Sequence, residues 1–559
     1  MTALTLPFTR MTYALCALFL VGCVRPGSWP FDRDSDADSD EGVVIASGDH
    51  SHTFEDRTRD AALDRQLRSL SDDTTTLSDV LRALPKGGDL HNHTSGAITT
   101  EKLIAWGRED GACVDKSNYT ASNPCAAMTT PLSEATPGTE LFEEVLAAWS
   151  MESFEGDLLE AHQHFFDAFA KYGAIQTNAR SDDALADVLS KAGRNGLIYV
   201  ELLQGFGSGT GASIANELFG EQDDVWDEPT LLARREQIIA HAKFQPAIDA
   251  QVSSIASTLS GARLLLGCDT PAPDAGCDVE PRFIVSANRT GNRLAVFGQW
   301  VFAYELAQRV PEVVGVNLVS PEENASSLAY YDDEMFALGV LDDFNDAAED
   351  RKVVHISLHA GELIPAVLPD GESQHLTFHI RRAVETAHAE RIGHGVDVLA
   401  ETDGDGVEDL LRDMARQDVM VEICLTSNRV LLGAAGEEHP LHAYRKHGVP
   451  VALATDDQGI FRTSITDEFV AAVKDQELDY TSLRKLVRTS LEHAFVEGES
   501  LWQTRDVFSR TVSACSNTRL GADNRSQGCE RYLADNKRAA LQWKLERQLR
   551  AFEADLLTR

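Results

Sequence analysis

The stretch Val353-Val354-His355-Ile356-Ser357-Leu358-His359-Ala360-Gly361-Glu362 joins an apolar run to a histidine, two small residues and a carboxylate. The apolar run is typical of a buried β-strand. An imidazole at the end of such a strand is suited to bind a metal, and a glutamate just beyond it is suited to move a proton. A strand cap with a structural histidine is the alternative for this stretch alone, so its meaning depends on the rest of the chain.

Seven more apolar runs of this kind occur along the chain. Each ends in a polar or glycine-containing corner, and most are followed by a helical pattern, as in residues 294–310 and 376–388. Eight strand–helix units predict an α/β fold of the (β/α)8 TIM barrel type. A doubly wound open sheet is the alternative, but no glycine-rich nucleotide fingerprint follows the first strand. The candidate strands are residues 88–91, 197–202, 282–286, 313–318, 353–359, 391–394, 419–424 and 449–455.

A long gap, about residues 98–196, separates the first two candidate strands and carries helical patterns. We expect it to be an insertion that lies over the barrel mouth as a lid. Its aromatic stripe consists of Phe165, Phe166 and Phe169. Such stripes more often belong to a core than to a ligand site, so we expect one or two of these rings to reach the pocket.

Helical periodicity also predicts elements on both sides of the barrel, which we place at residues 87–500. N-terminal helices are expected within residues 55–86. A C-terminal helical extension is expected over residues 501–559. It includes an amphipathic helix over residues 531–557 that would pack on the barrel exterior.

The N-terminus resembles a bacterial lipoprotein signal. Arg10 precedes an apolar stretch, residues 11–21, that is too short to span a bilayer and is followed by Gly22-Cys23. We expect residues 1–22 to be a signal peptide and Cys23 to carry a lipid anchor, the protein's one link to a membrane. The protein would then be exported to the bacterial envelope, periplasmic or on the surface. An ordinary cleaved signal, and hence a secreted protein, is the alternative.

Charge narrows the range of partners. The 559 residues carry a formal net charge of -39, and both nucleic-acid backbones and anionic lipid surfaces would repel such a chain. A small molecule is therefore the expected partner. The acidic, serine-interleaved run after the signal cannot bury apolar surface, so we expect residues 23–54 to be a disordered tether.

Six cysteines fall into three pairs that are close in sequence, each within a stretch rich in turn-forming residues. Disulfides that staple loops fit an exported protein. Zinc binding is the alternative, but these spacings are wider than those of zinc-binding cysteine pairs. Cys424 lies in an apolar run and is expected to be a buried free thiol. The pairs are Cys113 with Cys125, Cys268 with Cys277, and Cys515 with Cys529.

An acidic loop at residues 401–409 resembles part of a calcium-binding loop. Asp403, Asp405 and Asp409 are its candidate ligands for a structural Ca²⁺. The twelfth position holds Arg412 where a calcium loop has a bidentate glutamate, so a solvated acidic loop is the default interpretation.

Polar side chains recur at the ends of four expected strands. The first strand ends in His91-Asn92-His93, the fifth in His359, the sixth in His394 and the eighth in Asp456-Asp457. Alternation along a strand puts His91 and His93 on the same side. The ends of barrel strands meet at one mouth, where barrel enzymes do their chemistry, so these groups are expected to gather there.

Three imidazoles and a carboxylate suit zinc, which lowers the pKa of a bound water to about 7. Glu362 and His394 would then handle protons. This equipment suits hydrolytic attack on an sp² carbon, whereas the pattern of cysteine-ligated zinc deaminases is absent. The expected ligands are His91, His93, His359 and Asp456.

Residues 85–500 resemble the adenosine deaminases of the amidohydrolase superfamily. The matching segments occur in family order. The Pro-Lys-Gly lead-in, the long insertion and the export signal look most like the secreted, growth-factor-type branch. The segments are Pro85-Lys86-Gly87-Gly88-Asp89-Leu90-His91-Asn92-His93, His359-Ala360-Gly361-Glu362, Arg391-Ile392-Gly393-His394-Gly395, Thr426-Ser427-Asn428 and Thr455-Asp456-Asp457.

The resemblance implies roles for these residues, with one zinc ion per chain on the four ligands. Glu362 would protonate ring nitrogen N1 of the purine, and His394 would orient and deprotonate the zinc-bound water. Asp457 would hydrogen-bond the purine and help orient the hydroxide. The implied substrate contacts are His93, Ser95, Ser320, Gly361 and Asp457.

The implied activity is zinc-dependent hydrolytic deamination of adenosine and 2'-deoxyadenosine, releasing inosine or its deoxy form and ammonia. Ser95 stands where many members have an aspartate that contacts the ribose, and Ser320 where a glycine often passes the purine. A deaminase of another 6-aminopurine compound is therefore one alternative. A surface binding or signalling protein on a deaminase-like barrel is a second, non-enzymatic one.

Overall fold

The computed structural model describes three ranges, residues 54–220, 225–404 and 406–558. The chain divides into two units, residues 1–50 and residues 51–559. The expected signal peptide, Cys23 and the tether up to residue 53 lie outside the described residues. Within those ranges, no helix is long and apolar enough to cross a membrane.

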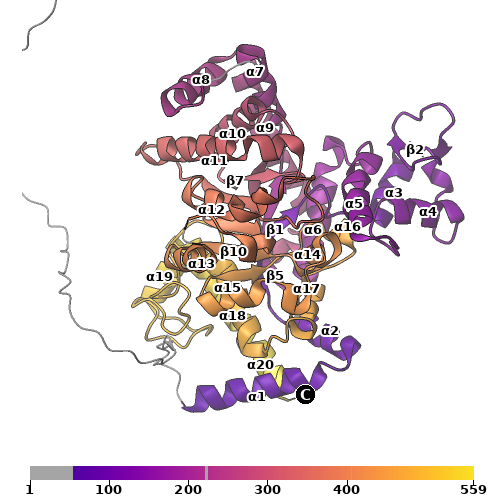
Figure 1. The fold of residues 1–559 in the computed structure, drawn as a ribbon. Coiled ribbons are helices and arrows are strands. Elements are labelled where there is room, and N and C mark those ends of the chain that lie inside the picture. Colours follow the sequence, from indigo (N-terminus) through magenta and orange to yellow (C-terminus); the bar gives the residue numbers. More distant parts are fainter. Residues whose placement is uncertain (1–53, 221–224, 405, 559) are drawn as a thin grey trace, which may run out of the picture. The chain divides into compact units, whose positions relative to one another are not determined.

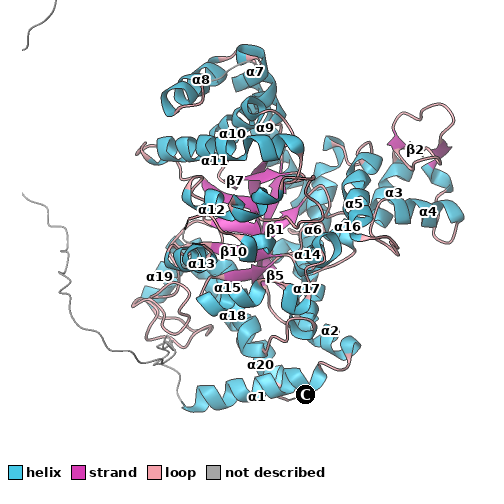
Figure 2. Cartoon of the chain, viewed as in Figure 1, coloured by secondary structure: helices cyan, strands magenta, loops and turns pink. Residues whose placement is uncertain are grey.

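Eight parallel strands form one sheet in the order β1-β5-β6-β7-β8-β9-β10-β11. A parallel bridge between Asn92 of β1 and Asp456, just after β11, joins the two edges of this sheet. The strands are surrounded by helices (Figure 2), so the predicted (β/α)8 barrel is confirmed. The strands are β1 Gly87–His93, β5 Leu197–Gln204, β6 Glu280–Asn288, β7 Val313–Val319, β8 His355–Ala360, β9 Arg391–His394, β10 Met420–Ile423 and β11 Val451–Leu453.

The helices alternate with these strands along the chain (Figure 1). Between β5 and β6 lie α7 Gly209–Phe219, α8 Glu228–Ala240 and α9 Phe244–Leu265. The next three connections carry α10 Arg293–Ala307, α11 Ala325–Asp346 and α12 His379–Glu385. The helices after β9 are α13 Val407–Arg416, α14 Leu425–Leu432, α15 Leu441–His447, α16 Gln458–Phe461, α17 Ile465–Lys474 and α18 Tyr480–Glu492.

Helix α10 is apolar on all sides because it is buried on all sides. It crosses α7 at two glycines. A Cβ atom on Gly298 would lie 2.3 Å from the carbonyl oxygen of Gly211, so any larger residue there would separate the helices.

The insertion after β1 contains more than helices. It holds α3 Thr100–Glu109, α4 Glu140–Ala148, α5 Leu158–Tyr172 and α6 Ser181–Arg194. It also holds a three-stranded sheet in the order β3-β2-β4, which the helical interpretation missed because each strand has only two residues. In Figure 1, β2, α3 and α4 lie to the right of the barrel strands, while α5 is nearer to them. The small strands are β2 Cys113–Val114, β3 Ala121–Ser122 and β4 Thr130–Pro131.

The flanking helices differ from expectation in one place. The N-terminal helices are α1 Phe54–Leu70 and α2 Thr74–Ala83. The single C-terminal helix predicted over residues 531–557 is wrong, since α19 Gln527–Asp535 and α20 Lys537–Leu556 are separated at Asn536. Asn536 has extended backbone angles, and its side-chain oxygen accepts the backbone N–H of Glu499, which holds the break in place.

All three predicted disulfides form: Cys113–Cys125, Cys268–Cys277 and Cys515–Cys529. The bridges are local, and none joins two barrel strands. Cys424 is free and buried, as expected.

Candidate active site

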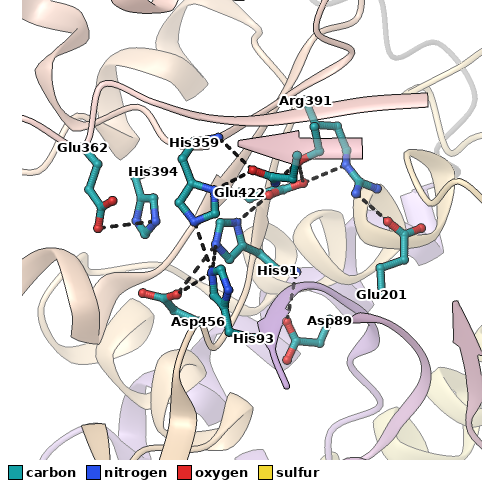
Figure 3. Close-up of polar contacts among 12 residues, drawn as sticks. Asp89, His91, His93, Glu201, His359, Glu362, Arg391, His394, Glu422 and Asp456 are labelled. Carbon is teal, nitrogen blue, oxygen red and sulfur yellow. Dashed lines mark hydrogen bonds and ion pairs between the residues drawn. The ribbon is translucent and has the colours of Figure 1, made fainter. Parts of the chain in front are cut away.

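Three histidine rings and one carboxylate converge at the carboxyl ends of the barrel strands (Figure 3). His91 and His93 come from β1, and Nε2 of His93 lies 3.3 Å from Nε2 of His91. The Nε2 atoms of His93 and His359, which is on β8, are 3.1 Å apart. Oδ1 of Asp456, just after β11, lies 3.4 Å from Nε2 of His93. The four expected ligands therefore share one centre.

Two further residues fix which ring nitrogen faces this centre. Nδ1 of His91 lies 2.7 Å from Oε2 of Glu422 on β10, and Nδ1 of His359 lies 2.7 Å from Oδ1 of Asn317 on β7. Because both oxygens are acceptors, each Nδ1 carries the proton and each Nε2 presents a lone pair. Lone pairs that converge beside a carboxylate lack hydrogen-bond donors, so the residues fit a bound cation such as Zn²⁺.

Glu422 is itself held by two other side chains. Its Oε1 forms an ion pair with Nε of Arg391 at 2.7 Å and accepts a hydrogen bond from Oγ of Ser357 at 2.9 Å. Arg391 also pairs with Glu201 (Figure 3). Burial of Glu422 would raise the pKa of its carboxyl group, but Arg391 and His91 outweigh burial and lower it. Glu422 is therefore an ionised acceptor that orients His91.

The pKa values of three of the four ligands fit groups free of protons. His91 is the exception, because its burial lowers its pKa but the carboxylates of Glu422 and Asp456 outweigh burial and raise it. Burial lowers the pKa of His93 to about 3 and that of His359 well below its usual value. Burial of Asp456 opposes its ionisation, but the neighbouring His394, His93 and His91 lower its pKa. Neutral imidazoles and an ionised carboxylate are the states in which these groups bind a metal.

Glu362 stands beside the cluster. Its Oε1 lies 3.6 Å from Nε2 of His394, and burial raises the pKa of its carboxyl group. The backbone N–H groups of Gly361 and Glu362 donate to the buried carboxylate of Glu322, at 3.2 and 2.8 Å. His379 and Arg289 flank Glu322 in turn, so the loop that carries Glu362 is firmly positioned.

Asp457 lies against a glycine that has no room for a side chain. A Cβ atom on Gly96 would lie 1.8 Å from Oδ1 of Asp457. That oxygen is buried and has no hydrogen-bond partner among the described residues. Burial, together with the adjacent Asp456, raises the pKa of Asp457 well above its usual value. Asp457 therefore fits a proton donor or an acceptor for a bound molecule.

Left-handed backbone conformations aim several of these side chains. His394, Asp456 and Ser320 have φ values of 67°, 57° and 83°, a region that residues other than glycine rarely occupy. Backbone strain of this kind persists only where the surrounding structure enforces it, and strained residues are common at functional sites.

A cavity of about 290 Å³ opens onto the cluster. All three phenylalanines of the α5 stripe line it, so the expectation of one or two was too low. Gly361 does not line it, because its Cα faces Asp397 and Ile380. The lining residues are His93, Ser95, Phe165, Phe166, Phe169, Val319, Ser320, His359, Glu362, Asp456 and Asp457.

A second cavity of about 280 Å³ shares Ser95 and Phe169 with the first. Hydroxyl and amide side chains line much of it, among them Thr94, Gln176, Asn178 and Gln204. Ser95 thus stands between a space beside the expected metal ligands and a more polar space next to it.

Comparison with known proteins agrees with this geometry. Residues 233–508 match the family model described as adenosine deaminase. This range of the chain carries an adenosine deaminase family domain. The matched range includes His359, Glu362, His394 and the Asp456-Asp457 pair.

Two curated relatives and one solved structure illustrate the similarity. An adenine deaminase of Rhizobium leguminosarum bv. trifolii is 28% identical over 224 residues, which is 40% of this chain and 60% of that protein. An adenosine deaminase of Plasmodium gallinaceum is 31% identical over 147 residues, 26% of this chain and 37% of that protein. The crystal structure of an adenine deaminase from Arthrobacter aurescens aligns with 74% of this chain and with 94% of the adenine deaminase chain. The identity is 18% and the TM-score is 0.45. The chain spans 37–60% of the length of these two curated relatives.

Several residues that hold this site are not evident from the sequence patterns alone. Asn317 and Glu422 are single polar residues within apolar strand runs, and this interruption was the available signal. Glu322 and His439 carried no such signal, because each lies outside the strand runs and contacts its partner only after the chain has folded back.

The acidic loop makes protein contacts instead of a metal cluster among the residues that the structure describes. Asp403 pairs with Arg382 at 2.8 Å, and Asp409 accepts from Arg412 at 3.2 Å. Asp405 lies outside the described ranges. Calcium binding by this loop stays a prediction.

Proposed function

We propose that the protein catalyses the hydrolytic deamination of adenosine and 2'-deoxyadenosine, releasing ammonia. One observation carries this proposal. Three imidazole Nε2 atoms and the Asp456 carboxylate converge at a cavity that also exposes Glu362 and Asp457. This arrangement supports a metal centre and proton-carrying groups beside a space for a small flat molecule. The match to the adenosine deaminase family supports the same reaction class.

We propose zinc as the resident metal, one ion per chain, held by His91, His93, His359 and Asp456. When bound, zinc would supply a water of lowered pKa at the wall of the cavity. The nitrogen-rich ligand set favours zinc over magnesium or calcium, which prefer oxygen ligands.

The protein's own side chains would bind the purine and move protons at it. Burial raises the pKa of Glu362, which suits a group that would give a proton to a ring nitrogen and so make the neighbouring carbon more electrophilic. The phenylalanines of α5 offer apolar faces to a flat ring. Asp457, which also lines the cavity, would hydrogen-bond the purine.

Ser95 and Ser320 offer hydroxyl groups to the sugar, which bind it less strongly than a carboxylate would. The polar cavity beyond Ser95 supports a substrate with a polar part next to its base. Free adenine is the rival substrate, since the similar Rhizobium protein is named an adenine deaminase.

We also propose that the protein works outside the cytoplasm, anchored through Cys23. The three disulfides support this location, because such bonds persist in oxidising compartments.

The test is turnover by zinc-loaded protein that lacks residues 1–22. Adenosine, 2'-deoxyadenosine and adenine are supplied separately, and ultraviolet absorbance follows loss of the amino group. Turnover of the two nucleosides with a higher kcat/KM than adenine is expected. An unchanged adenosine spectrum would refute the proposal, and adenosine binding without turnover would favour the non-enzymatic alternative.

A variant tests the role of Glu362. Glu362→Gln removes the transferable proton but keeps the shape of the side chain. It should lower kcat by at least about 100-fold, as expected for a lost general acid. Zinc content should stay at one per chain, and unchanged turnover would remove Glu362 from the mechanism.

A further inference from the structure

A buried chain of hydrogen bonds leads from His394 away from the cavity. Nδ1 of His394 lies 3.0 Å from Oδ1 of the Asn428 amide, and Nδ2 of that amide lies 2.9 Å from Nε2 of His439. Nδ1 of His439 accepts the backbone N–H of Leu441 at 3.1 Å. The side chains of His394, Asn428 and His439 are all buried, so water does not replace these contacts.

The backbone N–H of Leu441 determines which atoms donate and which accept in this series of hydrogen bonds. Leu441 begins helix α15, where a backbone N–H has no acceptor within the helix. Its donation to His439 requires a lone pair on Nδ1. Burial lowers the pKa of His439 to about 4, so the ring is neutral near pH 7 and its one proton is on Nε2.

This proton decides how the Asn428 amide is oriented. An N–H on His439 needs an acceptor, so the amide oxygen must face His439 and the NH2 group must face His394. A 180° rotation of the Asn428 amide exchanges the positions of its oxygen and its nitrogen. The amide still contacts both histidines after this rotation. The NH2 group then donates to Nδ1 of His394. A neutral His394 ring must therefore carry its proton on Nε2.

We propose that Asn428 and His439 hold His394 as its Nε2–H tautomer, so that His394 donates a hydrogen bond to the reacting oxygen. Nε2 of His394 is buried, lies 3.6 Å from Oε1 of Glu362 and lacks a hydrogen-bond partner among the described residues. A donor fixed there stabilises negative charge that develops on oxygen as it adds to the ring carbon. This inference rests on the proposed deamination.

Two consequences separate this role from others that His394 could have. A ring with a proton on Nε2 offers no lone pair to a metal, so His394 stays outside the set of four ligands although its Nε2 lies close to Asp456. It also cannot accept the proton of the attacking water, contrary to the base role that the family resemblance implies. That proton would pass to solvent, as the lowered pKa of a metal-bound water allows. Asn428 and His439 do not line the cavity, so they are positioning residues.

The direct test reads the tautomer and does not depend on activity. Zinc-loaded full-length protein labelled with ¹⁵N at histidine is compared by NMR with the His394→Gln variant, which identifies the His394 signals. The proposal expects a protonated Nε2 and an unprotonated Nδ1 near pH 7. A proton on Nδ1 would overturn it, whether or not adenosine is deaminated.

The kinetic test reverses the tautomer. In Asn428→Asp the carboxylate only accepts, so it would receive Nε2–H of His439 and require Nδ1–H on His394. We expect kcat to fall by about 100-fold, as for the loss of one preorganised donor. KM should change by less than about threefold, zinc content should stay the same, and the NMR signals should show the proton on Nδ1. An unchanged or higher kcat would contradict the proposal.

Asn345→Asp is the matched control. Asn345 is a buried amide at the end of α11 that bonds Lys352 and Arg351 and does not line the cavity. The same chemical change there should leave the His394 tautomer and kcat unchanged. If Asn428→Asp does not fold, the NMR measurement of the His394 tautomer in the unmodified protein still tests the proposal.

Discussion

The proposed ligands depend on residues that never touch the metal. Glu422 and Asn317 accept Nδ1–H of His91 and His359, and so decide that Nε2 of each ring faces the centre. Asn317 is the cleaner of the two to test, because Glu422 also pairs with the buried Arg391. A change at Asn317 removes one acceptor without leaving a buried charge unpaired.

Asn317→Ala should weaken zinc binding by about 10- to 100-fold, the usual effect of losing a partner that orients a ligand. Asn317→Asp keeps an acceptor at the same place and should bind zinc within about threefold of the original protein. Zinc affinity is measured by competition with a chromogenic chelator. Equal affinities for the two variants would show that Asn317 does not orient His359.

Among the elements, α5 brings aromatic side chains of the insertion to the barrel mouth. A capping box at its start, between Asp157 and Glu160, fixes where the helix begins. Phe165 stacks on Phe461 of α16, which follows Asp457 directly. The helix is thereby held against the loop that carries two site residues.

Phe166→Ala should raise KM for adenosine by about tenfold, because the variant loses roughly 1.4 kcal/mol of aromatic contact with the substrate. The kcat should change less than KM. Phe166 is partly exposed, so thermal stability should change little. Leu159→Ala on the same helix is the control, because Leu159 is 51% exposed and does not line the cavity. A KM that rises equally in both variants would mean that the effect comes from a weakened helix.

Lys86 joins the end of α2 to the end of α6. Its Nζ donates to the carbonyl oxygens of Leu81, Leu84 and Asn195, and burial lowers its pKa from 10.5 to about 7. Between these two values the unfolded chain holds a proton that the folded chain has lost. The free energy of unfolding therefore rises with pH in this window, and it is flat below pH 7, where both states are protonated.

Lys86→Met removes this titration. The free energy of unfolding of the original protein, minus that of the variant, should increase from pH 7 to pH 9 by on the order of 1 kcal/mol per pH unit. Chemical denaturation at several pH values measures this difference, in which the titration of other groups cancels. A constant difference would show that Lys86 titrates near its ordinary value.

At the scale of the whole molecule, the disulfides that contribute to stability lie apart from the residues of the candidate active site. The Asn92–Asp456 bridge closes the barrel at the cluster itself, whereas each disulfide staples a connection outside the barrel strands. None of the six bonded cysteines lines the cavity. Loss of a disulfide should therefore affect unfolding without affecting turnover.

The pair Cys268→Ala and Cys277→Ala should lower the free energy of unfolding by about 2–3 kcal/mol, as expected when a short loop is no longer closed in the unfolded chain. The kcat at 25 °C should be unchanged. Thermal unfolding and turnover are measured on the same zinc-loaded samples, with Cys424→Ala as a variant that keeps all three bonds. A lower kcat in the double variant would link this loop to the site.

The sequence alone determined the barrel, the three disulfides and the residues expected to converge. Strand periodicity, cysteine spacing and the ends of parallel strands are local patterns, and a closed barrel brings those ends together by symmetry. The two-residue strands β2–β4 and the break at Asn536 carried too little local signal for such a prediction.

Only the tertiary structure decided how the converging residues are held. Glu422, Asn317 and His439 take their roles from partners tens or hundreds of residues away or across a turn, and no spacing rule connects them. The stretch His359-Ala360-Gly361-Glu362 shows both sides of this division. Its histidine and glutamate lie beside the cavity as expected, while Gly361 serves the turn against Asp397. A sequence specifies which groups reach the strand ends, but hydrogen-bond direction depends on which neighbours folding places around them.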